Sequence, residues 1–532
     1  MMIAYAIITL LALLAAASCE LSRDLMMLQQ NSYRPERYSR WLRESGDTTA
    51  PWRLLGFVVF FIALSLFSHA LGSQALMLLF GVFTVWRLLR QKYKKPLVWT
   101  QRARRIYAVA AVLALLTLAG AAFAFAQGSV ESAMYSTAVA ALGVYCASHC
   151  YMFAAVWLLK PVDKAINRKF YNRAAGLLQS MPDLKIVGIT GSYGKTSTKH
   201  YLYRILSEHF DTLMTPGSYN TTLGVTRTIN EMLKPYNEVF IVEMGAKNVG
   251  DIKEICDLVH PHIGVVTAVG PQHLESFGSI ENVCRTKFEL VDSLPSDGLA
   301  VVNNDFEAAA ARPVSNVACE RYGIKNTAGA RFTAVDIEYD SYGSGFTVRD
   351  LEGKLPDLRL RTRLLGECNI SNLLAAVAVA RHLAVPDDKI AYAVEQIEQV
   401  EHRLSIKRTP GGVTILDDAF NSNPVGSSMA MEVLGKMPGR GIVVTPGMIE
   451  LGEQTFELNA QLGDAIARNA DIAIIVGHYN RDAIVEGLRR SGMPEDRVRL
   501  VDSFAEAQSV LQPMLRAGDT VLYENDLPDT FK

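Results

Sequence analysis

Apolar residues dominate the first third of the chain, where they form long runs separated by polar and mostly basic segments. A helix needs about 20 residues to cross a bilayer, and several of these runs approach that length. The pattern therefore predicts a helical membrane domain over residues 1–160 with about five transmembrane helices. The predicted spans lie at 2–18, 54–71, 73–89, 105–126 and 133–159.

Basic residues concentrate in two of the connecting segments, 20–53 and 87–105, whereas the short turns near Gly72 and Gly128 carry no Lys or Arg. Loops with an excess of Lys and Arg stay in the cytoplasm. We therefore expect both basic segments inside the cell, the N-terminus outside, and everything after Lys160 inside. This predicts a multi-pass protein of the cytoplasmic (inner) membrane whose later domains are cytoplasmic.

Two features of this region have a second interpretation. Residues 14–19 could end a signal peptide before a lipid-modified Cys19, but no basic segment precedes the run, and a retained span is favoured. Cys146, His149 and Cys150 are three and four residues apart, so on one helix they would share a face and could hold a metal ion or haem. Packing of small and semi-polar residues between helices is the favoured explanation.

From Asp183 onward, short β-branched runs alternate with helical segments. This alternation is typical of parallel sheets with crossover helices. Two such series predict an α/β fold in two domains, a central domain over 184–402 and a smaller, Rossmann-like C-terminal domain over 403–532. A linker over 161–183 precedes them. The predicted strands include 185–190, 239–242, 263–266, 299–302, 413–416, 441–444, 472–476 and 520–523.

Charge and cysteine content narrow the function classes. The 532 residues include 53 Lys+Arg and 54 Asp+Glu, a balance that argues against a nucleic-acid-binding protein. The seven cysteines are scattered and show no paired spacing in the later domains, which argues against a disulfide framework and for a reducing compartment.

A glycine-rich turn follows the first predicted strand of the central domain and precedes a helical stretch. Its glycines let backbone N–H groups surround phosphate oxygens, and the helix N-terminus adds a favourable dipole. A lysine supplies charge for the outer phosphates, and the next residue, a threonine, can hold Mg²⁺. Ile189 replaces the first glycine of the usual pattern. The segment predicts an ATP site formed by Gly191, Ser192, Tyr193, Gly194, Lys195, Thr196 and Ser197.

This loop and several later stretches resemble the Mur ligase family, ATP-dependent enzymes that add amino acids to peptidoglycan precursors. Within the family, the likeness is greatest to the type that adds D-alanyl-D-alanine. The resemblance covers about residues 184–532 and rests on motifs that occur in the family's order. These motifs lie at 219–225, 242–246, 272–275, 285–289, 366–372, 401–404, 417–424 and 448–453.

The resemblance implies a metal site. Glu243 lies at a strand end where the family holds Mg²⁺, and His273 resembles a second ligand of that site. Together with Thr196 these residues suit Mg²⁺ at two positions that bridge phosphate oxygens. Lys287 falls where the family carries a lysine that reacts with CO₂ and then helps to hold the metal. A semi-buried site would promote the loss of its proton.

The resemblance also implies nucleotide and substrate contacts. Asn369 and Asn372 match the adenine-side motif, in which Cys368 replaces the usual histidine. Arg403 matches the arginine at the domain junction that reaches the γ-phosphate when the domains close. Further ATP-binding candidates are Asp418 and Asn421, and the substrate-loop candidates are Asn220, Thr221 and Thr222.

These roles imply an amide (peptide) ligase of envelope precursor synthesis. ATP would phosphorylate a substrate carboxylate to an acyl phosphate, which an amine then attacks to give an amide, ADP and phosphate. The implied partners are a nucleotide-linked or lipid-linked glycopeptide, an amine donor and membrane lipids, with no nucleic acid. Two alternatives remain: the same chemistry on a lipid-linked or other envelope-polymer acceptor, and a non-catalytic membrane scaffold.

Two regions depart from the family pattern. About two dozen residues separate the last predicted span from the phosphate-loop strand, too few for the soluble domain that holds the uridine-diphosphate end of the family's substrate. At the C-terminus, Glu524, Asp526 and Asp529 replace a basic and hydroxylic segment that contacts the incoming dipeptide. Unless a cation intervenes or these acids lie on a solvated turn, they would repel the carboxylate of D-alanyl-D-alanine.

Overall fold

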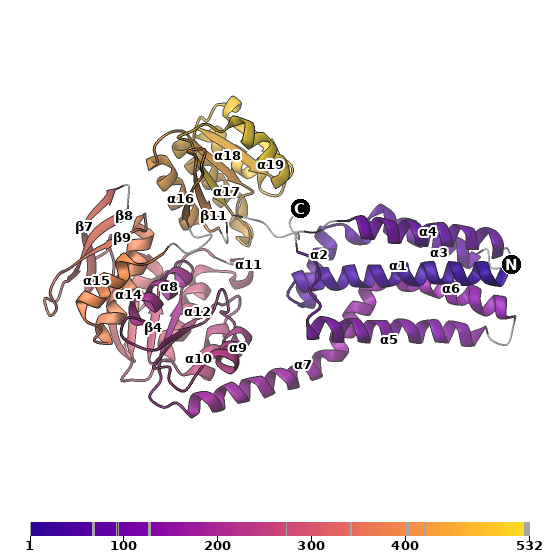
Figure 1. The fold of residues 1–532 in the computed structure, drawn as a ribbon, viewed down its shortest axis with the longest axis horizontal. Helices are drawn as coiled ribbons and strands as arrows, with labels where there is room; N and C mark the ends of the chain where they lie inside the picture. The colour runs from indigo at the N-terminus through magenta and orange to yellow at the C-terminus, as the bar shows by residue number, and fades with distance from the viewer. Residues whose placement is uncertain are drawn as a thin grey trace. The chain divides into compact units, whose positions relative to one another are not determined.

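The computed structural model describes residues 2–65, 70–91, 93, 95–125, 129–272, 274–340, 343–398, 404–419 and 422–525. The chain divides into two compact units between Ile166 and Asn167. We refer to the part before this point as the helical unit and to the part after it as the α/β unit. Figure 1 shows the fold of both units.

Five helices of the helical unit, α1, α3, α4, α5 and α6, pack against one another as a bundle (Figure 1). Two short elements, α2 and η1, lie between the first two bundle helices in sequence. The bounds are α1 (Met2–Gln30), α2 (Pro35–Glu44), η1 (Asp47–Thr49), α3 (Pro51–Ser65), α4 (Ala70–Arg90), α5 (Gln101–Ala124), α6 (Val130–Cys146) and α7 (Ser148–Gln179).

Among the described residues, three helices, α1, α4 and α5, are long and apolar enough to cross a membrane, and the pair α6–α7 adds a fourth candidate if it counts as one span. α3 is apolar but has 15 described residues. A bend of 74° separates α6 from α7. The run predicted as one span over 133–159 therefore falls on two helices.

The bend also separates Cys146, the last residue of α6, from His149 in the first turn of α7. The shared helix face expected of Cys146, His149 and Cys150 is therefore wrong. The environments also differ: Ser148 accepts a hydrogen bond from buried Arg53 and His149 faces buried acids, whereas Cys150 is exposed.

Arg53 of α3 is completely buried inside the helical unit. Its guanidinium group pairs with Glu20 at 2.8 Å and Asp24 at 3.0 Å, both on α1, and with Asp47 of η1 at 3.2 Å. A buried charge is tolerated when it is paired and hydrogen-bonded, as it is here. One side chain thus joins three segments of the unit.

Arg23 of α1 and Arg87 of α4 extend these contacts. Arg23 pairs with Glu20 at 2.9 Å and with Asp47, and Arg87 reaches Glu20 at 3.3 Å. Three guanidinium groups therefore balance three carboxylates. We call Glu20, Arg23, Asp24, Asp47, Arg53 and Arg87 the charge network. Arg23, Arg53 and Arg87 belong to the basic segments that predict the membrane orientation, but in the structure they neutralise buried acids.

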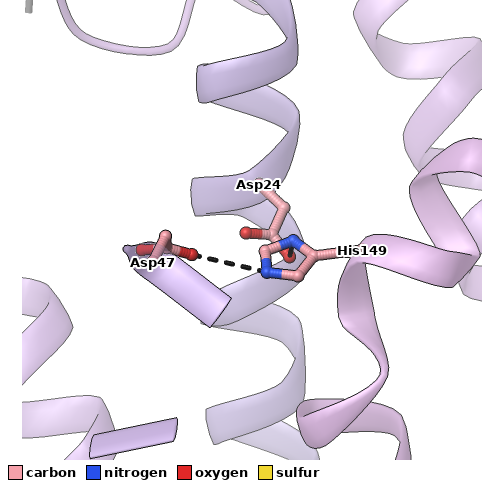
Figure 2. Close-up of side chains that lie close together, drawn as sticks. All are labelled: Asp24, Asp47 and His149. Carbon is pink, nitrogen blue, oxygen red and sulfur yellow. Dashed lines mark ion pairs between the residues drawn. The ribbon is translucent and has the colours of Figure 1, made fainter. Parts of the chain in front are cut away.

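His149 lies between two acids of the charge network (Figure 2). Its Nδ1 is 3.1 Å from Asp24 Oδ2 and its Nε2 is 3.4 Å from Asp47 Oδ2. The three side chains place ligand atoms within 4.8 Å of one another, a spacing that a metal ion could bridge. Arg23 and Arg53 already contact these carboxylates, and a divalent cation would unbalance the buried charge. We interpret the cluster as an ion-pair network.

The α/β unit holds two sheets. The sheet of the central domain has nine strands in the order β2-β3-β1-β4-β5-β6-β7-β8-β9. Pairing is parallel from β2 to β7, and β7, β8 and β9 form an antiparallel meander. The bounds are β1 (Lys185–Thr190), β2 (Thr212–Met214), β3 (Val239–Glu243), β4 (Ile263–Val266), β5 (Leu299–Asn303), β6 (Ala318–Tyr322), β7 (Phe332–Asp340), β8 (Gly343–Asp350) and β9 (Leu358–Thr362).

Helices cover both faces of this sheet, because successive strand residues point to opposite sides. Val187 and Ile189 of β1 pack into a core with α8 and α14, whereas Ile186 packs into a second core with α9, α10 and α12. The bounds are α8 (Lys195–Leu206), α9 (Thr222–Met232), α10 (Asp251–Val259), α11 (Leu274–Phe277), α12 (Ile280–Asp292), α13 (Glu307–Ala310), α14 (Glu367–His382) and α15 (Asp387–Glu395).

The C-terminal domain has a six-stranded sheet in the order β10-β11-β15-β12-β13-β14, parallel except for β10. All four strands predicted here are present. The strand bounds are β10 (Ser405–Arg408), β11 (Thr414–Asp418), β12 (Gly441–Thr445), β13 (Ile472–Val476), β14 (Val498–Val501) and β15 (Thr520–Glu524). The helices are α16 (Pro424–Lys436), η2 (Gly452–Gln454), α17 (Thr455–Asn469), α18 (Arg481–Arg490), η3 (Glu495–Arg497), α19 (Phe504–Leu511) and η4 (Gln512–Met514).

The charge network yields a stability prediction. Arg53→Met keeps much of the side-chain volume but leaves three buried carboxylates short of one positive charge, which should cost roughly 3–5 kcal/mol. We expect a lower unfolding midpoint for the full chain in detergent, followed by tryptophan fluorescence, because all five tryptophans lie in the helical unit. Arg43→Met, at an exposed position of α2, is the matched control. Equal midpoints for the two variants would contradict a supporting role for the network.

Candidate functional site

The turn between β1 and α8 requires two of its glycines. Gly191 has φ +148° and Gly194 has φ +78°. A Cβ at Gly191 would lie 2.2 Å from Thr267 Oγ1, and one at Gly194 would lie 2.3 Å from Asn372 Oδ1. Any larger residue would therefore force the loop open. The resulting loop lies at the carboxyl end of β1, where parallel sheets bind ligands.

Lys195 is the first residue of α8, so the positive end of the helix dipole lies at the loop. Its ammonium group donates to the carbonyl oxygens of Gly191 at 2.6 Å and Ser192 at 3.3 Å. Ser192 and Tyr193 fasten the loop to the segment after β4 through Gly270 and Pro271. The loop thus presents a lysine, backbone N–H groups and a helix N-terminus, which together suit phosphate.

Glu243 ends β3, the strand beside β1, and is 1% exposed. Its Oε1 accepts hydrogen bonds from Thr196 at 3.2 Å and from Asn220 at 3.0 Å, and Lys199 lies 3.0 Å from its Oε2. Burial alone would raise the pKa of Glu243. The charges of Lys199 and Lys195 and the Asn220 hydrogen bond outweigh it and lower the pKa below its ordinary value. The carboxylate is therefore ionised.

The predicted substrate loop contacts the Glu243 carboxylate through Asn220. The Asn220 side chain donates a hydrogen bond to Glu243, and the backbone carbonyl oxygen of Asn220 accepts one from Gly245 N at 2.7 Å. Thr221 caps α9 by accepting from Gly224 N, and Thr222 is the first residue of the helix. The capping fixes where the loop ends and so where Asn220 points.

Lys287 lies on α12 and is 2% exposed. Burial, and then the positive charge of Lys195, lower the pKa of Lys287 well below its ordinary value. The neutral amine is the form that reacts with CO₂. The environment thus supplies the condition that carbamate formation at this position requires.

Asn369 and Asn372 connect α14 to α8. Asn372 accepts from Thr198 at 3.2 Å beside the phosphate loop, and buried Asn369 accepts from Tyr201 at 2.7 Å. His273, Arg403 and Asn421 lie outside the described residues. Among the described site residues, the structure brings Lys195, Thr196, Glu243, Asn220 and Asn372 to one end of the central sheet.

Two acids meet at the carboxyl ends of neighbouring strands in the C-terminal domain. Asp418 of β11 is in register with Glu524 of β15, and its side chain accepts from Leu404 N at 3.0 Å. Glu524 is completely buried and accepts from Ser422 and from Ser427 at 2.7 Å. Burial, and then the charge of Asp418, raise its pKa to about 8. The solvated-turn alternative is therefore wrong for Glu524; Asp526 and Asp529 lie outside the described residues.

Comparison with known proteins identifies the family. The Mur ligase middle domain matches residues 189–380, and the glutamate ligase domain of Mur ligases matches residues 402–523. The UDP-N-acetylmuramoyl-tripeptide–D-alanyl-D-alanine ligase of Escherichia coli (strain K12) is 32% identical over 316 residues, which are 58% of this chain and 68% of that protein. The chain belongs to the Mur ligase family. The enzyme of the same name from Mycobacterium tuberculosis (strain H37Rv) is 31% identical over 64% of this chain and 70% of its own length.

Solved structures agree with this assignment. MurF from Acinetobacter baumannii superposes with a TM-score of 0.61 at 26% identity, over 68% of this chain and 78% of that one. MurF from Thermotoga maritima, solved in complex with ADP, shares the fold with a TM-score of 0.60 at 24% identity, over 68% and 80%. The predicted Mur ligase fold and the prediction of an ATP-dependent ligase are therefore confirmed.

The buried acid of the C-terminal domain gives a pH-dependent prediction. The folded chain keeps the Glu524 proton up to pH about 8, whereas the unfolded chain loses it near 4.5. The stability that protonated Glu524 contributes is therefore complete below pH 4.5 and is lost as the pH rises through about 8. Glu524→Gln cannot ionise and keeps the serine contacts.

We expect Glu524→Gln to gain stability over wild type between pH 5 and pH 8, by on the order of a few kcal/mol. The measurement is urea unfolding of the full chain in detergent, with pulse proteolysis reporting the C-terminal domain. Exposed Glu495→Gln is the control. A difference between Glu524→Gln and wild type that does not change with pH would show that Glu524 is ionised in the fold.

Proposed function

We propose that this chain is a membrane-anchored, MurF-like ligase that joins the carboxylate of an envelope glycopeptide precursor to an amine through an amide bond. The observation that carries the proposal is the surroundings of Glu243. One carboxylate oxygen, Oε1, accepts hydrogen bonds from Thr196 of the phosphate loop and from Asn220 of the predicted substrate loop. Nucleotide, cation and acceptor would therefore meet at one point.

The residues present fit Mg²⁺. A threonine hydroxyl and an ionised carboxylate are hard oxygen donors, which this cation prefers. Thr196 and Glu243 would hold it, together with His273 and a carbamylated Lys287, at the two positions that the family likeness implies. When bound, Mg²⁺ stabilises negative charge on the phosphate oxygens.

The chemistry then needs two displacements. A carboxylate oxygen of the acceptor attacks the γ-phosphorus of ATP and ADP leaves; the amine nitrogen then attacks the acyl carbon, phosphate leaves, and the nitrogen loses a proton. Lys195 would neutralise charge on the transferred phosphoryl group, and Arg403 would complete this on domain closure. Asn369, Asn372, Asp418 and Asn421 would bind the nucleotide.

The helical unit would anchor the enzyme in the cytoplasmic membrane with the N-terminus outside. Large apolar side chains point outward from its helices, with Leu11, Leu79 and Leu116 59%, 69% and 63% exposed. Such a surface suits lipid rather than water. In this orientation the ATP site faces the cytoplasmic ATP pool.

The two ligase hypotheses differ in the acceptor that carries the carboxylate. The relatives in the comparison are named for a UDP-linked muramoyl tripeptide and D-alanyl-D-alanine. A lipid-linked glycopeptide is the second candidate, favoured by the bundle of apolar helices that precedes the ligase domains. Glu524 also stands where the family pattern has a basic and hydroxylic segment, so it offers no positive partner to the carboxylate of D-alanyl-D-alanine, which favours another amine donor.

The test is ADP release by the full chain in detergent with D-alanyl-D-alanine or other short amine donors. Lys195→Ala should lower turnover on the order of a hundredfold or more, because it removes charge from the transferring phosphoryl group. Exposed Lys234→Ala is the control. Turnover on the nucleotide-linked precursor supports the first acceptor, and turnover restricted to the lipid-linked one supports the second. Unchanged cellular function of Lys195→Ala would support the scaffold.

Lys287 has its own test. In bicarbonate enriched in ¹³C, we expect a carbamate carbon signal from wild type that is absent from Lys287→Met, since the neutral buried amine is poised to react. The signal should weaken when CO₂ is removed and return when it is restored. A spectrum shared by wild type and Lys287→Met would contradict carbamylation.

A further inference from the structure

Lys199 is a completely buried lysine on α8 that the family motifs did not single out. It lies four residues after Lys195, so both side chains project from one face of the helix. Its ammonium group is 3.0 Å from Glu243 Oε2 and donates to the carbonyl oxygen of Gly217 at 2.6 Å. A buried ammonium group has a large cost unless it is paired, and these contacts compensate for it.

The two oxygens of Glu243 have different surroundings. Oε1 faces Thr196 and Asn220, whereas Oε2 faces Lys199 and has no hydrogen-bond partner apart from this ion pair in the described part of the chain. A cation beside the hydroxyl of Thr196 would therefore meet Oε1. Lys199 can remain on Oε2 while that cation binds.

We propose that Lys199 is a positioning residue that makes Glu243 a one-oxygen ligand for the cation of the phosphate site. By holding Oε2, the ammonium group presents Oε1 toward Thr196. The same ammonium group donates to Gly217 and so fixes the segment that leads to Asn220. Lys199 therefore supports both the cation site and the predicted substrate loop. This inference rests on the proposed function, because it concerns the cation that the ligase reaction uses.

The consequence is selectivity among cations. Mg²⁺ demands near-ideal octahedral geometry, whereas Ca²⁺ is larger and accepts a carboxylate through one oxygen or both. An ammonium group on Oε2 opposes two-oxygen binding by charge and by occupancy. Lys199 should therefore favour Mg²⁺ over Ca²⁺, and its removal should shift the balance toward Ca²⁺.

A purely structural role for Lys199 predicts a different result. If the lysine merely fills and neutralises the interior, its loss would weaken folding and reduce binding of both cations alike. The ratio of the two affinities would then stay the same. That ratio separates positioning of a ligand oxygen from general support.

The experiment measures binding of a fluorescent ADP analogue to the full chain in detergent, titrated with Mg²⁺ or with Ca²⁺. For Lys199→Met we expect the Mg²⁺ concentration at half-saturation to rise roughly 10- to 100-fold, as for other lost supports of metal ligands. The Ca²⁺ value should change less, so that the Mg²⁺/Ca²⁺ preference falls. Lys253→Met, at an exposed position of α10, should match wild type.

Lys199→Gln provides a second variant if the methionine does not fold, because its amide can still donate to Gly217 without the charge. It should show the same fall in preference. An unchanged ratio in a folded variant would overturn the inference and leave the proposed function intact. Absence of cation-dependent nucleotide binding in wild type would overturn the proposed function, and this inference with it.

Discussion

The carboxylate of Glu243 is ionised and buried, so its negative charge must be compensated. Several elements of the central domain contribute to this compensation. β3 delivers Glu243 to the carboxyl end of the sheet beside β1, and α8 delivers Lys199 and Thr196 from the following turn. The predicted substrate loop contributes Asn220. Strand order, the start of α8 and the conformation of the loop before α9 therefore serve one carboxylate. Charge that a cation can share is held in place before any ligand arrives.

The helical unit solves the same problem in the opposite way. Its charge network balances three carboxylates with three guanidinium groups, and His149 adds polar contacts to Asp24 and Asp47. No negative charge is left over for a cation among these residues. The network joins α1, η1, α3 and α4, which suits a role in fixing helix packing. In the central domain, the ion pair between Lys199 and Glu243 instead keeps Glu243 Oε1 facing the Thr196 hydroxyl.

The sequence predicted the parallel strands and the phosphate loop because these are local patterns: β-branched runs of the right length and glycines at fixed spacing. It missed the β7–β9 meander, although Leu and Arg alternate along β9 and its three strands follow one another in the chain. It also missed Lys199, whose role depends on Glu243, 44 residues later in the numbering. The bend before Ser148 was equally hidden, because apolar composition continues through it and Arg53, which donates a hydrogen bond to Ser148 there, lies far away in sequence.

The C-terminal domain illustrates why likeness to a family indicates the type of reaction more firmly than the identity of the substrate. In the proposed reaction the phosphate loop and Glu243 would activate the carboxylate, and both lie in the matched middle domain. The departure from the family's pattern for the incoming dipeptide lies in the C-terminal domain, where Asp418 and Glu524 are in register on adjacent strands. A protonated, buried Glu524 bound to Ser422 and Ser427 shapes that sheet edge without presenting a basic group. If the donor binds at this edge, as the family likeness implies, a free carboxylate would find no positive partner in Glu524, and the choice of amine would depend on this edge rather than on the ATP site.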